Sequence, residues 1–426
     1  MISSLTCKNF RNIDVDNLTF KRINILIGPN NSGKTNFLHA LAFCSDMLKR
    51  GNGNASSSFL NEVAYNGWQK VLNRVAGDDG SIRFQWGLSV NNRELDYVFQ
   101  FHAGRQQPDF YITSEKLESR GVSIKYNRPF NFFDCHTKTL GSGIISTAKN
   151  KGEQNTRVRF QVSNQDTVMM QFQKILLENG ELYNTPGFRK DGMTIVEDLT
   201  AYFRKFFSYS SAYFDLAAIR KPSDSRIRGD VLFENGSNFV NVLNQRFSLN
   251  GYLRKEMEEK IRCIMPKFDE MNISVISEQC KLQLALQGNF YDMDEVSDGT
   301  IKVLLLIALL FVPNPDTIQK NSPEFSLLTL DEPETNLHPA WQKWVSRWIM
   351  ESANFEQCFV STHSPELLDG FTEGFRRGEV AILVFDPRQS MLIHNLEYEE
   401  IKSDLGEWEL GDLYRTNEPV IGGWPW

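Results

Sequence analysis

Apolar and polar residues alternate through much of the N-terminal part of the chain. Strands are predicted at Ile2–Asn9 and Arg22–Ile27, and a helix at Thr35–Arg50. Further strands are predicted in three segments with a period of two, Ile82–Val90, Leu95–His102 and Asp109–Leu117. Because this alternation turns one face of each strand toward a core and the other toward water, the three segments predict a half-buried antiparallel sheet.

The middle of the chain changes to helical periodicity. From about residue 165 to 268, apolar residues recur every three or four positions, as in Thr194–Phe207 and Phe239–Met257. No heptad repeat is sustained, so no long coiled-coil arm is expected. Strands and helices alternate again from about 272 to 394. The longest apolar run, Val303–Val312, is too short to span a bilayer and predicts a buried helix.

A glycine-rich segment follows the strand Arg22–Ile27. It reads GPNNSGKT over residues 28–35 and matches the phosphate-binding pattern G-x-x-x-x-G-K-[S/T]. Its glycines let successive N–H groups face phosphate oxygens, and the helix that follows adds partial positive charge. Lys34 supplies a full charge to the β- and γ-phosphates, and the Thr35 hydroxyl is offered to Mg²⁺. The predicted ATP-binding residues are Asn30, Asn31, Ser32, Gly33, Lys34 and Thr35.

Two acids follow a second apolar strand. The run FSLLTL, Phe325–Leu330, ends in Asp331 and Glu332. Ligands of open α/β sheets gather at the carboxyl ends of strands, so Asp331 is predicted to hold Mg²⁺ and Glu332 to activate the attacking water. The next strand, around Cys358–Val360, is followed by His363, which we predict to sense the γ-phosphate.

These motifs resemble those of the ABC/SMC-like ATPases, and within them the prokaryotic AAA-type ATPases related to RecF and the OLD proteins. The matching segments are KNFRNIDVDNL, GPNNSGKT, ENGSNFVNVL, EVSDGTIKVLLLIALL, LLTLDEPETNLHP, STHSPELLD and ELGDLY. The clear motifs cover roughly the first 50 and the last 130 residues.

The resemblance implies roles that spacing alone does not give. Ser297 and Gly299 lie in a segment similar to the signature motif, which in the family caps the γ-phosphate held by the other protomer. This chain has SDGT where the better-known transporters have SGGQ. Glu334–Leu337 corresponds to the D-loop and His363 to the switch histidine. For the glutamine loop, Gln85, Gln69 and Gln100 all remain candidates.

The expected fold is α/β, an ABC-type P-loop ATPase head with a mixed sheet flanked by helices and a mainly helical insertion. The predicted division is 1–125 for the N-terminal part of the core, 126–269 for the insertion, 270–400 for the C-terminal part and 401–426 for a tail. About 30 residues follow the last predicted strand, too few for a fused effector domain.

Composition and the N-terminal residues predict a cytoplasmic protein. The N-terminus has no signal pattern, no membrane association is expected, and the six cysteines form no CxxC pair, which argues against a zinc site or a disulfide framework. The net charge of −7 gives no support for a general grip on nucleic acid. The basic cluster of Arg220, Lys221, Arg226 and Arg228 is either a solvated loop, the favoured interpretation, or a contact with a partner or nucleic acid.

The sequence thus predicts an ATPase that uses ATP and Mg²⁺ and dimerises head to tail around the nucleotide. The favoured hypothesis is the sensor or regulatory subunit of a bacterial anti-phage system that controls a separate effector, such as a nuclease or toxin. A DNA-binding repair ATPase like RecF is the alternative. A transporter nucleotide-binding subunit is a third, disfavoured by the large insertion and the opening KNFRNI pattern.

Overall fold

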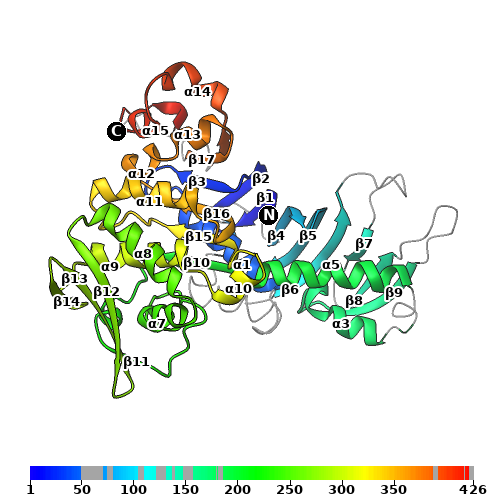
Figure 1. Cartoon of the computed structure of the whole chain (residues 1–426). Helices are drawn as coiled ribbons and strands as arrows, with labels where there is room; N and C mark the ends of the chain where they lie inside the picture. Colours follow the sequence, from blue (N-terminus) through cyan, green and yellow to red (C-terminus); the bar gives the residue numbers. More distant parts are fainter. Residues whose placement is uncertain are drawn as a thin grey trace. The chain divides into compact units, whose positions relative to one another are not determined.

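The strand that leads into the glycine-rich segment lies inside a parallel sheet (Figure 1). β3 (Ile23–Ile27) is flanked by β16 (Phe355–Ser361) and β17 (Val380–Asp386), and β15 (Phe325–Asp331) pairs with β16, all in parallel register. The structure is a computed structural model and describes residues 1–48, 71–73, 80–103, 110–120, 131–136, 140–146, 157–178, 180, 186–386, 392–416 and 418–421.

Two further strands complete this sheet, β10 (Phe206–Ser210) and β18 (Leu392–Leu396), in the order β10-β15-β16-β3-β17-β18. Every residue of β3 and β17 is buried. Continuous apolar runs suit central parallel strands, because helices cover both faces of such a sheet. The predicted strands at 22–27, 325–330 and 358–360 are confirmed.

The chain forms two compact units, and the glycine-rich segment passes from one to the other. The first unit holds Met1–Lys21, Asn30–Phe206 and Phe385–Asn395, and the second holds the remaining segments. The predicted boundaries at residues 125, 269 and 400 stay predictions.

The first unit is built on an eight-stranded antiparallel sheet with the order β2-β1-β4-β5-β6-β7-β8-β9. Its first five strands are β2 (Ile13–Thr19), β1 (Ile2–Phe10), β4 (Ser81–Val90), β5 (Arg93–Ala103) and β6 (Phe110–Ser119). β5 alternates buried and partly exposed residues, as predicted for a half-buried strand. Strand β2 was not predicted.

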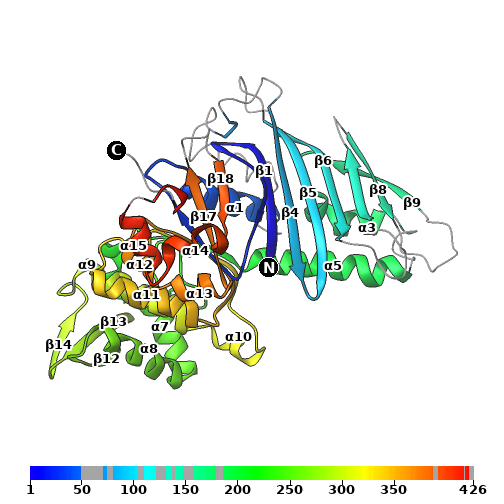
Figure 2. The same cartoon turned by 90° about the horizontal axis from the view of Figure 1, so that it is seen from above.

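The sheet continues into the segment predicted as a mainly helical insertion. Strands β7 (Asn131–His136), β8 (Leu140–Ser146) and β9 (Arg157–Ser163) extend it, which corrects the first part of that prediction. Helices α3 (Val168–Glu178) and α5 (Pro186–Arg204) then pack against it, and Figure 2 shows both on the same side of the strands. α1 (Lys34–Leu48) contacts α5.

In the second unit the predicted helix at 239–257 is two helices, α7 (Phe239–Leu249) and α8 (Gly251–Ile264). Asn250 separates them with an extended backbone, and its side chain accepts the Tyr252 N–H at 3.0 Å, as an N-cap does. A small antiparallel sheet follows, made of β12 (Phe268–Ile276), β13 (Gln279–Leu286) and β14 (Asn289–Asp292), with the two-residue β11 (Ser223–Asp224) at its edge.

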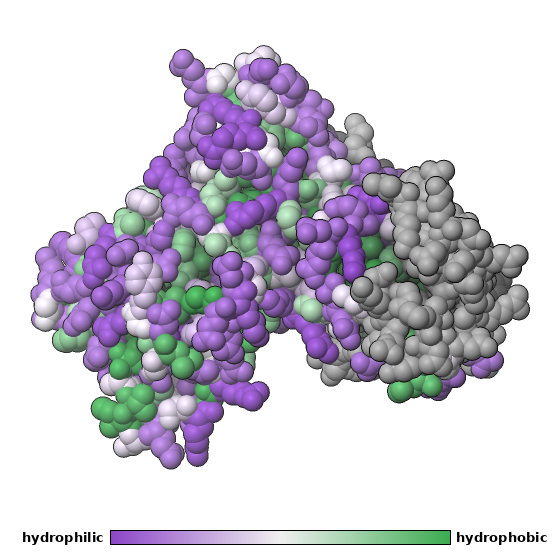
Figure 3. Space-filling model, turned by 45° about the vertical axis from the view of Figure 1, so that its right-hand side comes forward, coloured by the Kyte–Doolittle hydropathy of each residue, from purple (hydrophilic) through white to green (hydrophobic). Residues whose placement is uncertain are grey.

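The apolar run at 303–312 belongs to α9 (Asp298–Phe311), in which every residue from Gly299 onward is buried. This confirms the predicted core helix. By length and composition Asp298–Gln319 passes as a membrane span, but 67% of its apolar window is buried inside the protein. α9 contacts α8 and α11 (Pro339–Glu351). On the face seen in Figure 3 hydrophilic residues predominate, with hydrophobic residues in small groups.

Candidate active site

Two carboxylates end strand β15 in the second unit. Asp331 lies in register with Ser361 of the neighbouring strand β16. The Ser361 hydroxyl donates to Asp331 Oδ1, and the Ser210 hydroxyl lies 3.5 Å from Asp331 Oδ2. Ser361 is fully buried, so it fixes the Asp331 carboxylate at the strand end. Ser361 could not be found from the sequence alone, because only the strand register brings it beside the acid.

Glu332 turns sharply out of the strand. Its φ of 47° lies in the left-handed region, which non-glycine residues occupy at a cost. The Glu332 N–H donates to the Ser361 hydroxyl at 3.1 Å, and its carbonyl accepts the Ser211 hydroxyl at 2.5 Å. His363 Nε2 lies 3.4 Å from Glu332 Oε1. The structure therefore brings the two predicted catalytic residues together, with the Glu332 side chain 43% exposed.

A third acid, Glu334, supports the backbone of His363. Its Oε1 accepts the Thr362 hydroxyl at 2.7 Å and the His363 N–H at 2.9 Å, so it holds the backbone of the histidine. Burial raises the pKa of Glu334, and these two hydrogen bonds partly oppose the rise. Its Oε2 is buried with no hydrogen-bond partner in the described part of the chain.

The phosphate loop leaves the end of β3. In the second unit β3 adjoins β16, with Ser361 opposite Leu26, and the Thr362 N–H donates to the Leu26 carbonyl at 3.1 Å. The strand that starts the loop therefore ends beside the strand that carries His363. Gly28, the first glycine of the loop, has a φ of 143°, which L side chains rarely adopt.

The rest of the loop opens helix α1 in the first unit. Asn31 and Gly33 have φ values of 64° and 106°. A side chain at Gly33 would begin 2.7 Å from Asn12 Nδ2, so this glycine is required for close packing as well as for its backbone conformation. The Ser32 hydroxyl is buried and has no partner among the described residues, which suits a ligand. Thr35 is exposed at the first turn of the helix.

The turn between β1 and β2 supports the loop from within the same unit. Asn36 donates to Asn12 at 2.7 Å, and Arg11 donates to Asn36 at 2.7 Å. Arg11 is buried with a φ of 52°. Arg11 and Asn12 belong to the matching segment KNFRNI, but the sequence alone gives them no role.

The signature segment begins helix α9 in the second unit. Ser297 is the N-cap, and its hydroxyl accepts the Thr300 N–H at 3.2 Å. A side chain at Gly299 would begin 2.5 Å from the Asn336 carbonyl, so the signature segment packs directly on the D-loop of its own chain. Lys302 adds a second link, since its ammonium donates to the Thr335 carbonyl at 3.4 Å. Burial lowers the pKa of Lys302.

The basic cluster divides between two surroundings. Arg226 pairs with Asp224 at 2.6 Å in an exposed loop, as the solvated-loop interpretation predicts. Arg220 instead pairs with Asp298 of the signature segment at 2.7 Å. Lys221 and Arg228 are exposed.

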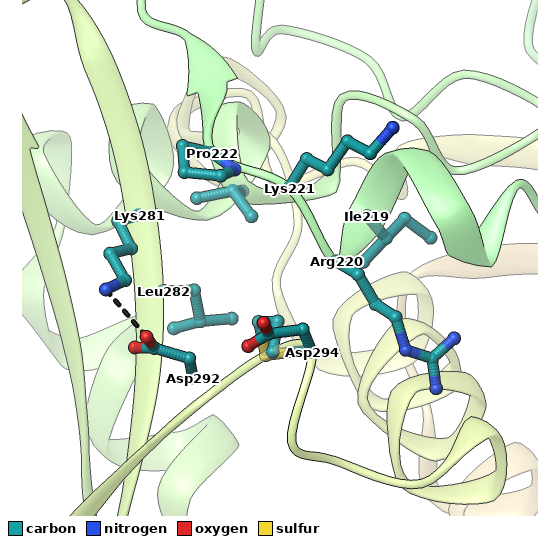
Figure 4. A pocket seen from close by; sticks show the side chains of 10 residues that line it. Ile219, Arg220, Lys221, Pro222, Lys281, Leu282, Asp292 and Asp294 are labelled. Atoms are coloured by element: carbon teal, nitrogen blue, oxygen red, sulfur yellow. Dashed lines mark ion pairs between the residues drawn. The ribbon is translucent and has the colours of Figure 1, made fainter.

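A pocket of about 140 Å³ lies beside Arg220, between β13 and the segment after β14 (Figure 4). Lys281 and Asp292 pair at 2.8 Å on one side of it. It is smaller than the roughly 300 Å³ that ligand pockets usually need, so it does not suit a nucleotide.

A C-terminal tyrosine also contacts the start of the phosphate loop. Tyr414 lies in α15 (Leu410–Arg415), and its phenol is hydrogen-bonded to the Gly28 backbone. Burial, followed by the nearby Glu334 charge, raises the pKa of Tyr414. Arg415 pairs with Asp369 at 3.0 Å and ties α15 to α12 (Pro365–Asp369). The tail motif ELGDLY thus packs on helix α12 and on Gly28 at the start of the phosphate loop.

The glutamine loop remains open. Gln85 and Gln100 lie within paired strands β4 and β5, where Gln85 accepts from Arg83 and Gln100 bonds Ser81. Gln69 lies outside the described residues.

Strand ends that carry a phosphate loop, an acid pair and a histidine define a P-loop ATPase, and an N-capped signature helix is expected of the ABC-type branch. The chain belongs to the AAA_15 family, described as an AAA ATPase domain, whose profile matches residues 1–368. It is an ATPase.

Three relatives illustrate the range of this similarity. "Endonuclease GajA" of Bacillus cereus is 23% identical over 86% of this chain and 56% of its own length. "Retron Vc95 probable ATPase" of Vibrio cholerae is 20% identical over 83% of this chain and 68% of its own length. "ATP/GTP phosphatase" of Helicobacter pylori is 22% identical over 89% and 90%. The chain therefore spans little more than half of GajA.

Among solved structures, the fold is similar to SMC head domains. One such head, bound to the C-winged helix domain of ScpA, is 13% identical with a TM-score of 0.47, and covers 94% of this chain and 99% of its own. The SMC head of Thermotoga maritima is 10% identical with a TM-score of 0.42, over 93% and 98%.

Proposed function

We propose that this ATPase is a nucleotide-gated switch in which ATP closes a head-to-tail dimer. The observation that carries the catalytic part is the order β15-β16-β3 in the second unit. Three adjacent parallel strands end in the acid pair, in His363 and in Gly28, and the carboxyl ends of such strands are where ligands bind. Residues Asn30–Thr35 follow Gly28 and Pro29 in the chain.

Each residue then has one task. The backbone of Asn30–Gly33 and the Lys34 ammonium hold the phosphates, and the buried Ser32 hydroxyl supplies one more polar group. Thr35 and Asp331 hold Mg²⁺, which neutralises charge on the phosphates when bound. Glu332 accepts the proton of the attacking water. His363 lies 3.4 Å from Glu332 Oε1 and orients that carboxylate toward the γ-phosphate.

The signature segment supports the proposed dimer. The first N–H groups of a helix have no partner within the helix and attract anions. In α9 the Ser297 hydroxyl accepts the Thr300 N–H, which leaves those of Asp298 and Gly299 for a ligand. A second copy can supply that ligand as the γ-phosphate on its own phosphate loop, under two-fold symmetry. ATP then favours closure because only the closed state offers both sets of contacts.

The names of two relatives support a proposal about the output of the switch. Two relatives are named as a retron probable ATPase and as an endonuclease. These names describe the relatives and not this chain. We propose that this chain is the regulatory ATPase of an anti-phage system and that it controls a nuclease or toxin. The contact between the signature segment and the D-loop supplies a path for the signal, since Gly299 and Lys302 both touch that loop.

Steady-state ATP hydrolysis and nucleotide binding test the catalytic assignment. Lys34→Ala should abolish ATP binding, and Glu332→Gln should bind ATP but hydrolyse it at least about 100-fold more slowly. Lys402→Ala is the matched control, because Lys402 pairs with Glu399 on an exposed helix. Normal ATP affinity in Lys34→Ala, or normal turnover in Glu332→Gln, would contradict the assignment.

The effector is tested by co-purification from the native host, followed by mass spectrometry. The Glu332→Gln protein with ATP should retain a nuclease or toxin that Lys34→Ala releases. If both variants retain DNA and no such protein, the RecF-like alternative replaces this proposal.

A further inference from the structure

The signature segment of this chain carries a negative charge where a phosphate is proposed to bind. Asp298 is the first residue of α9, and its side chain is 51% exposed. A carboxylate at this position interacts favourably with the helix N-terminus, but it repels a phosphate that approaches the same N–H groups. The transporter motif SGGQ has glycine here. In this chain the Asp298 carboxylate would repel a bound phosphate unless its charge is neutralised.

Arg220 lies against that carboxylate. Its Nη2 donates to Asp298 Oδ1 at 2.7 Å and to the Val296 carbonyl at 2.9 Å. One guanidinium therefore neutralises the acid and also fixes the residue two positions before it. The Arg220 side chain is only 26% exposed, which weakens screening of the pair by solvent.

The backbone of Arg220 is held on both sides. It directly follows the short helix α6 (Leu216–Ile219), which is capped by the Asp215 side chain and anchored by the buried Ile219. Three residues later the chain pairs with β13 through β11. The backbone of Arg220 is therefore held in place, and little conformational entropy is lost when its side chain pairs with Asp298.

The other charged groups near Arg220 and Asp298 have hydrogen-bond or ion-pair partners of their own, although the Asp298 charge also acts on Lys302 and raises its pKa against the effect of burial. Lys281 pairs with Asp292 at 2.8 Å, and Figure 4 shows the Arg220 guanidinium directed away from that pair and from Asp294. Lys302 donates to the Thr335 carbonyl and faces the D-loop. Among the described residues, Arg220 is the ion-pair partner of Asp298.

We propose that Arg220 is a positioning residue that neutralises Asp298, so that the signature segment can accept the γ-phosphate of ATP bound to a second copy of this chain. This inference rests on the proposed head-to-tail dimer. It assigns Arg220 to the nucleotide-dependent interface, whereas the solvated-loop interpretation holds for Arg226. Loss of Arg220 leaves a carboxylate facing the phosphate, and loss of both side chains removes the conflict.

The test measures the ATP concentration that gives half-maximal dimer in the Glu332→Gln background, by light scattering with Mg²⁺. Arg220→Ala should raise it by at least about tenfold, while Arg220→Ala combined with Asp298→Asn should return it to within about threefold. The effect of Arg220→Ala should shrink at high salt. Arg226→Ala is the matched control and should behave like the parent.

The outcomes separate this inference from the proposed function. If the parent forms no dimer with ATP, the proposed function falls and this inference with it. If the parent dimerises and Arg220→Ala needs no more ATP, the inference alone is overturned. A double variant as weak as Arg220→Ala also overturns it, since rescue by Asp298→Asn is what charge neutralisation requires and what a purely structural role of Arg220 does not produce.

Discussion

Glu115 in the first unit makes the stability of this protein depend on pH in a calculable way. The residue is buried in the antiparallel sheet, where its Oε1 accepts the Tyr97 hydroxyl at 2.8 Å and its Oε2 accepts the Val168 N–H at 2.6 Å. The carboxylate thus caps the start of helix α3. Desolvation nevertheless dominates and raises the pKa of Glu115 from 4.5 to about 7.

The direction in which the folding stability changes with pH follows from proton linkage. Between pH 4.5 and about 7 the folded protein binds a proton at Glu115 that the unfolded chain has lost. The stability contribution of this group is therefore fully present below pH 4.5 and is lost as the pH rises through about 7. The difference between the two pKa values corresponds to about 3 kcal/mol.

Glu115→Gln removes this titration and keeps an acceptor for the helix N-terminus. The assay is urea unfolding between pH 4.5 and 8, followed by hydrogen exchange of the peptide 168–178 so that the first unit is observed separately. Relative to the wild type, the variant should gain about 3 kcal/mol as the pH rises across this range. Glu118→Gln on the same strand, where Glu118 pairs with Lys116, is the control. A wild-type-to-variant difference that stays constant with pH would refute the reasoning.

Three further predictions concern the second unit. Ser361→Ala should lower kcat about tenfold at nearly constant KM for ATP in steady-state kinetics, because it removes the hydrogen bond from Ser361 to the Asp331 carboxylate. Arg246→Met should cost roughly 3–5 kcal/mol in urea unfolding, because it leaves Glu324 buried and unpaired, and replacing both by apolar residues should recover most of the loss. Tyr414→Phe should lower turnover more than ATP affinity, measured by kinetics and calorimetry, since the phenol steadies the first glycine of the phosphate loop; unchanged kinetics would separate the tail from catalysis.

The parallel core could be predicted from the sequence because its strands are continuous apolar runs. Phe325–Leu330 is buried throughout, and the phosphate loop follows β3 as its motif requires. The limits of elements were less predictable. Asn250 splits one periodic stretch into α7 and α8 through a cap, which periodicity does not encode. Strands β7 (NFFDCH) and β8 (LGSGIIS) show no regular alternation, whereas β9 does alternate, at Val158, Phe160 and Val162, and was not predicted.

The candidate site was predictable where a motif is local in sequence. Glu332 and His363 were found from strand ends, and the structure brings them together. Ser361, Glu334 and Arg220 act through partners set by strand register or by long-range packing. Arg220 lies 78 positions before Asp298, so no spacing rule connects them. From the sequence, Glu334 was expected only as part of the D-loop, Arg220 only as part of the basic cluster, and Ser361 not at all.

The central claim is that each ATP is held by the phosphate loop of one protomer and the signature segment of its partner. Mixing two inactive variants tests it most directly. Lys34→Ala lacks a working phosphate loop, and Ser297→Arg blocks the signature segment. Each homodimer should be inactive, whereas a heterodimer retains one intact composite site, so an equal mixture should recover about a quarter of wild-type ATP hydrolysis. A mixture no more active than the two variants alone would contradict the account.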